Sequence, residues 1–120
     1  MKKLTICFDI DNVICKTLNG KYKKSIPIKK NIKIINLLKN KGHYIKLFTA
    51  RCMGRSKENK ILAKRLAYKL TVTQLKKWNV NYNEVIFGKP SFDLYIDDKS
   101  LFFKKNWNKE ILKKIRQIVL

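Results

Sequence analysis

The sequence predicts an α/β fold with a mainly parallel sheet that is covered by helices on both faces. Two observations lead to this prediction. Short apolar runs, typical of buried strands, alternate along the chain with longer stretches in which apolar residues recur at helical spacing. Continuous apolar runs also suit parallel strands, because helices cover both faces of such sheets. The length of 120 residues corresponds to one domain, which we expect to span residues 1–120.

Four short apolar runs are predicted to form the strands. Each is rich in Ile, Val, Leu, Phe or Tyr and is followed by polar residues or by glycine. These runs cover residues 4–10, 44–48, 85–87 and 94–96. Their positions between helical stretches predict parallel pairing rather than hairpins.

Three stretches are predicted to form helices. In the first, residues 28–38 carry Ile or Leu at helical spacing behind Pro27, and Gly42 follows where a helix can stop. The second covers residues 61–70, and its continuation to residue 78 is left open; the third covers residues 111–119.

Residues 17–24 are long enough only for a small flap. We expect Trp78, Tyr82, Tyr95 and Trp107 to be core or interface aromatics.

The formal net charge of +21 invites a nucleic-acid interpretation, because basic surfaces attract phosphate backbones. However, 25 of the 29 basic residues are lysine, and they are scattered along the whole chain. Abundant Lys, Asn and Ile is typical of an AT-rich coding sequence. We therefore interpret the charge as a solvated surface, and nucleic acid is kept as a disfavoured partner.

Cysteine usage and hydropathy predict a cytoplasmic protein without a membrane partner. The three cysteines form no CxxC pair and are odd in number, which favours reduced thiols over a disulfide framework. No run of about 18 apolar residues is present.

Polar side chains follow each predicted strand. In a parallel sheet these positions share one edge, where ligands bind. Each pair taken alone has a simpler interpretation as a turn or a helix cap, but the whole set in this order favours a functional site. The set comprises Asp9, Asp11, Thr49, Arg51, Gly88, Lys89, Asp97 and Asp98.

Four carboxylates at one edge predict a cation among them, since like charges repel. Oxygen ligands without a His or Cys cluster favour Mg²⁺, which commonly works beside phosphate. Lys89 would add positive charge, and the Thr49 hydroxyl could donate to a phosphoryl oxygen. This equipment suits phosphoryl transfer.

Four short motifs carry a resemblance to a known family. FDIDNVI, LFTAR, FGKP and YIDDKS, in this order and spacing, resemble the motifs of the haloacid dehalogenase (HAD) superfamily. FTARCMGRS, TVTQLKKWNV and FGKPSFDLYIDDKS resemble its small branch of capsule-biosynthesis phosphatases over most of the chain. The resemblance implies a Rossmann-like, HAD-like fold without a separate cap domain. Capless members can also close their sites with a neighbouring subunit, so the sequence leaves undecided whether the protein forms a homo-oligomer.

The resemblance also implies catalytic roles. Asp9 would be the nucleophile that forms an aspartyl-phosphate, and Asp11 would act as general acid and then general base. Thr49 and Lys89 complete the implied catalytic set. An aspartate at position 11 favours phosphatase chemistry over the superfamily's other reactions.

The metal and substrate contacts are implied in the same way. Mg²⁺ would be held by the Asp9 carboxylate, the Asp11 main-chain carbonyl and one of Asp97 or Asp98, with Asp98 favoured. The implied substrate-binding residues are Asn12, Ala50, Arg51 and Arg55.

Three residues depart from the family pattern. Val13 stands where threonine is commoner, which removes a hydroxyl but none of the principal roles. Asn12 stands where glycine is commoner, although Asn tolerates left-handed backbone nearly as well. Cys52 stands where glycine is expected after TAR.

Three functions follow from these observations. The leading hypothesis is a Mg²⁺-dependent phosphatase that hydrolyses a phosphomonoester of a sugar or similar small metabolite. The alternative is a phosphatase for polynucleotide ends or nucleotides, motivated by the charge and an open site. The third is a catalytically weak binding protein that keeps the fold, which is disfavoured because every principal catalytic position is filled.

Overall fold

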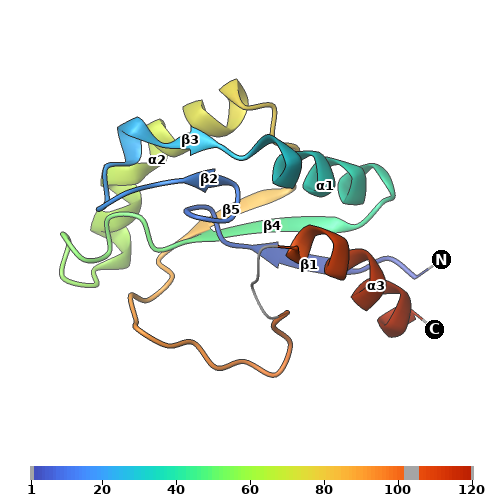
Figure 1. Ribbon diagram of the computed structural model, residues 1–120. Coiled ribbons are helices and arrows are strands. Elements are labelled where there is room, and N and C mark those ends of the chain that lie inside the picture. The colour runs from blue at the N-terminus through green and yellow to red at the C-terminus, as the bar shows by residue number, and fades with distance from the viewer. Residues whose placement is uncertain (1, 102–105, 120) are drawn as a thin grey trace.

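The computed structural model describes residues 2–101 and 106–119 (Figure 1). In chain order the elements are β1 (Thr5–Phe8), β2 (Cys15–Lys16), the 3₁₀ helix η1 (Tyr22–Lys24), β3 (Ile26–Pro27), α1 (Lys29–Asn40), β4 (Tyr44–Thr49), α2 (Lys60–Lys77), β5 (Glu84–Phe87) and α3 (Trp107–Val119).

The central sheet has three parallel strands in the order β1-β4-β5. Ile6 pairs with Ile45, and Thr49 pairs with Phe87. Two helices make the connections, α1 between β1 and β4 and α2 between β4 and β5 (Figure 1). The predicted class, a Rossmann-like parallel α/β sheet flanked by helices, is confirmed, and no separate cap is formed by residues 2–101 and 106–119.

The core lies against one face of β4. Ile45 and Leu47 are fully buried, and they belong to the same apolar cluster as Ile35 of α1 and Ile111 of α3. This alternation is expected when successive side chains of a strand point to opposite faces. Phe8 of β1 contacts Trp107 of α3, with ring centroids 5.9 Å apart. The opposite sheet face is more polar and open, with an ion pair between Lys46 and Glu84.

The helix boundaries follow local chemistry. Asn59 caps α2, because its side chain accepts a hydrogen bond from the Leu62 N–H at 3.1 Å. The second predicted helix does continue past residue 70, to Lys77. Pro27 lies in β3 rather than in the first turn of α1. The predicted flap is an antiparallel hairpin of β2 and β3 around η1.

The prediction of a strand at residues 94–96 is wrong for this structure. These residues lie in an exposed segment, drawn in orange in Figure 1, and the Ile96 side chain is 87% exposed. Strand-like composition forms a strand only where the residues can pair and be buried. Residues 94–96 pair with no described strand, and Leu94, Tyr95 and Ile96 bury little of their surface. Among the strands described, β1 consequently forms an edge of the sheet.

His43 makes folding stability depend on pH. Its buried Nδ1 accepts a hydrogen bond from the Leu4 N–H at 3.0 Å. Burial, followed by the charges of Lys3 and Lys41, lowers the pKa of His43 below its ordinary value of 6.5. The neutral form is therefore favoured in the folded state. Its contribution to stability is complete above pH 6.5 and is lost as the pH falls from 6.5 through the lower folded-state pKa.

We expect the free energy of unfolding to decrease on acidification from neutral pH to about pH 5. In His43→Asn the amide oxygen can accept the same bond without titrating, so part of this decrease should disappear. Urea unfolding at both pH values measures it. An equal decrease in the parent and in His43→Asn would contradict the assignment.

No helix in the described part of the chain is long and apolar enough to cross a membrane.

Candidate active site

Asp9 and Lys89 meet at the carboxyl edge of the sheet, although 80 residues separate them. Lys89 Nζ lies 3.2 Å from Asp9 Oδ2. The Ile10 N–H donates to the other carboxylate oxygen, Asp9 Oδ1, at 2.7 Å. The Asp9 side chain is 37% exposed. A ligand can therefore reach the carboxylate while two donors hold its orientation.

A backbone hydrogen bond connects the ends of β4 and β5 next to this pair. The Lys89 N–H donates to the Thr49 carbonyl oxygen at 3.1 Å. Gly88 makes the turn with φ of +91°, and an added Cβ would lie 2.9 Å from the Lys60 side chain. Only glycine combines this left-handed backbone with so close an approach. Gly88 thus directs Lys89 toward Asp9.

The electrostatic surroundings of Asp9 are mixed. Burial raises the pKa of the Asp9 carboxyl above its ordinary value, and the nearby Asp11 charge adds to this effect. Lys89 and the Ile10 N–H act in the opposite direction. Lys89 is the cation that compensates this carboxylate, and its own side chain is largely buried.

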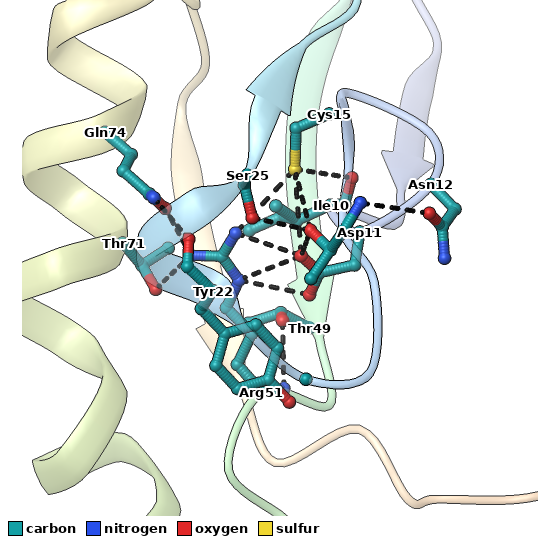
Figure 2. A network of polar contacts seen from close by, with 12 residues as sticks. Ile10, Asp11, Asn12, Cys15, Tyr22, Ser25, Thr49, Arg51, Thr71 and Gln74 are labelled. Atoms are coloured by element: carbon teal, nitrogen blue, oxygen red, sulfur yellow. Dashed lines mark hydrogen bonds and ion pairs between the residues drawn. The ribbon is translucent and has the colours of Figure 1, made fainter.

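Arg51 binds Asp11 (Figure 2). Arg51 is only 1% exposed. Arg51 Nε and Nη2 each lie 3.0 Å from an Asp11 carboxylate oxygen, which is the bidentate geometry of a strong ion pair. The remaining Arg51 nitrogen, Nη1, donates to Thr71 Oγ1 at 3.1 Å and to Gln74 Oε1 at 2.6 Å, both on α2. The guanidinium also lies 5.0 Å from the centre of the Tyr22 ring.

The prediction that Arg51 binds substrate is therefore not supported by its placement. Its donors are directed to Asp11, Thr71 and Gln74, and almost none of its surface reaches solvent. The loop after β4 turns this side chain inward, toward the end of β1. Arg51 acts on the site through Asp11.

The other predicted substrate contacts have different surroundings. Arg55 is exposed and donates to the Gly20 carbonyl oxygen at 2.8 Å, which ties it to the flap. Ala50 is partly buried against the small cluster of Cys52 and Met53. Asn12 is exposed, and its Oδ1 accepts from the Thr17 N–H at 3.2 Å. Asn12 and Arg55 still have surface available to a ligand.

Two of the three departures from the family pattern, Asn12 and Cys52, occur at left-handed backbone. Asn12 has φ of +67°, as its tolerance for this region predicts. Cys52 has φ of +64° and is buried, so a bulkier residue occupies a conformation that favours glycine.

Thr49, also predicted to be catalytic, is fully buried, and its Oγ1 accepts from the Arg51 N–H at 3.1 Å. Accepting that bond does not use the hydroxyl hydrogen.

Asp97 and Asp98 do not join Asp9 and Asp11 in this structure. Both lie in the exposed segment of residues 91–100, because residues 94–96 do not extend beside β1. Within residues 2–101 and 106–119, no three His, Cys, Asp or Glu side chains are grouped closely enough to hold a metal. Lys89 and Arg51 already neutralise Asp9 and Asp11. The described arrangement therefore does not fit the predicted Mg²⁺ site.

The residues that support Arg51 were not predicted from the sequence. Thr71 and Gln74 are three positions apart, and both are buried on α2. Gln74 Nε2 also donates to the Tyr22 carbonyl oxygen at 2.7 Å, which attaches the flap to the helix. The available signal was the presence of two polar residues on the apolar face of a predicted helix, since buried polar groups usually have partners.

Comparison with known proteins supports the fold. The crystal structure of an MCSG target from Vibrio cholerae superposes on this chain with a TM-score of 0.76 and 21% sequence identity. The match covers 94% of this chain and 98% of that chain. No protein-family model and no curated protein matches the sequence. At this identity the structural likeness concerns the fold alone.

Proposed function

We propose that this protein is a HAD-type phosphomonoesterase that hydrolyses a small phosphorylated metabolite through an aspartyl-phosphate on Asp9. The observation that carries the proposal is the contact between Asp9 and Lys89. It joins the first and third of the four sequence motifs at the ligand-binding edge of a parallel sheet.

In the proposed reaction, an Asp9 carboxylate oxygen attacks phosphorus, and the bond from phosphorus to the leaving-group oxygen breaks. Lys89 stabilises the negative charge that collects on the phosphoryl oxygens. Water then attacks phosphorus, which releases phosphate and restores Asp9. Asp11 is assigned the two proton transfers, to the leaving oxygen and from the water. Arg51 fixes the position of the Asp11 carboxylate.

Mg²⁺ remains a prediction from the sequence and the resemblance. No step above depends on it, because the described residues do not form its site. The family would supply a third carboxylate from Asp97 or Asp98, and these residues lie elsewhere here. The cofactor is therefore tested separately from the nucleophile.

A phosphatase screen tests both parts. We expect phosphate release from an aryl phosphate, sugar phosphates and nucleotides in the presence of Mg²⁺, and loss of release after chelation with EDTA. Full activity after thorough chelation would contradict the Mg²⁺ prediction and leave the proposed nucleophile intact. An absence of turnover on every substrate, with Mg²⁺ or Mn²⁺ added, would contradict the phosphatase itself.

The proposal places the enzyme in the cytoplasm. Its three thiols, in Cys7, Cys15 and Cys52, are unpaired, as suits a reducing compartment. The family branch implied by the resemblance would place it in capsule biosynthesis.

A further inference from the structure

An exposed pair of aromatic rings stands beside the proposed reaction centre. Phe92 and Tyr95 stack with ring centroids 4.9 Å apart and planes inclined by 14°. Phe92 is 46% exposed and Tyr95 is 52% exposed. Tyr95 was expected to be a core or interface aromatic, and its exposure shows that it is not a core residue. Large exposed rings of this kind often mark a binding surface.

Lys89 links this ring pair to Asp9. Its Nζ lies 5.4 Å from both ring centroids and 3.2 Å from Asp9 Oδ2. An ammonium above the outer face of one ring would be much closer to that ring than to its stacked neighbour. Nζ is in cation–π range of both rings at equal distance, so Lys89 is not centred on the outer face of either ring.

We propose that Phe92 and Tyr95 form a stacking site for the planar ring of a nucleoside monophosphate whose phosphate lies at Asp9 and Lys89. This inference rests on the proposed function, and it names the leaving group. Lys89 would contact the phosphate while a purine or pyrimidine lies on the aromatic pair. Stacking needs only a flat π face, so it sets a preference for a base without reading its identity.

Two substrates isolate the contribution of the base. Adenosine 5′-monophosphate and ribose 5-phosphate carry the same phosphoester on the same sugar carbon, but only the first has a base. Base stacking on a protein aromatic contributes about 1–3 kcal/mol, so kcat/KM for the nucleotide should be roughly five- to 150-fold higher than for the sugar phosphate. In Phe92→Leu and Tyr95→Leu this ratio should fall toward one.

Two further variants control for other causes. Leu94→Ala changes an exposed residue of the same segment and should keep the parental ratio. Tyr95→Phe keeps the ring but removes the hydroxyl that donates to Asp97 at 3.3 Å, and it should also keep the ratio. If the ratio of kcat/KM for the nucleotide to kcat/KM for the sugar phosphate falls as far in Leu94→Ala as in Tyr95→Leu, the stacking site is overturned.

Failure of this inference is distinguishable from failure of the proposed function. Equal turnover of both substrates by the parent would overturn the stacking site and leave the phosphatase standing. If neither substrate is hydrolysed, titration calorimetry with the same two compounds decides the stacking site. The stacking site predicts that the parent binds the nucleotide more tightly than ribose 5-phosphate, and that this preference weakens in Tyr95→Leu. Equal affinities of the parent for the two compounds would overturn the stacking site.

Discussion

Asp9→Asn should lower kcat by roughly a thousandfold or more, because removing a nucleophile removes the covalent route. The variant should stay folded, since the amide occupies nearly the same space and can still accept the Ile10 N–H. Steady-state phosphate release and a urea unfolding curve, measured on the same preparation, check both expectations.

Asp93→Asn is the matched control, because it removes one exposed carboxylate near the site without touching the proposed nucleophile. It should turn over substrate at close to the parental rate. Parental turnover by Asp9→Asn would show that another group attacks phosphorus, or that water attacks it directly.

Arg51→Ala should destabilise the fold by about 3 kcal/mol, the lower end of the range for removing one partner of a buried ion pair, because the Asp11 side chain is 21% exposed. The Asp11 carboxylate loses its bidentate partner, and Thr71 and Gln74 lose the donor between them. Such a loss is a large share of the roughly 5–15 kcal/mol that stabilises a typical domain. Urea unfolding followed by circular dichroism measures it.

Arg55→Ala provides the comparison at an exposed arginine of the same loop. It removes the contact with the Gly20 carbonyl and should change the free energy of unfolding by less than about 1 kcal/mol. Arg51→Lys should be intermediate, because lysine keeps the charge but lacks the planar fork. A loss below 1 kcal/mol in Arg51→Ala would contradict the structural role assigned to this pair.

The parallel sheet was predictable because its strands are continuous apolar runs and its helices have apolar faces. The juxtaposition of Asp9 and Lys89 followed from the same logic, since residues just after parallel strands share one edge. These predictions needed only local patterns and one topological rule. They hold for β1, β4 and β5, each of which contributes side chains to a shared core.

The fourth strand and the role of Arg51 were not predictable in this way. Residues 94–96 have a strand-like composition, but strand formation also depends on pairing and burial, and these residues have neither in this structure. Arg51 follows its strand like a ligand-binding residue, and only the packing of α2 against the flap buries it. Both outcomes depend on contacts between segments distant in sequence, which leave no periodic signal in the sequence.

The central claim is that Asp9 carries the phosphoryl group during turnover, and covalent trapping tests it most directly. The protein is mixed with substrate, quenched in acid and digested, and its peptides are analysed by mass spectrometry. We predict a phosphoryl adduct on the peptide containing Asp9, which disappears when substrate is omitted and in Asp9→Asn. Rapid turnover with no adduct on Asp9 at any quench time, or with the adduct on a different residue, would contradict the claim.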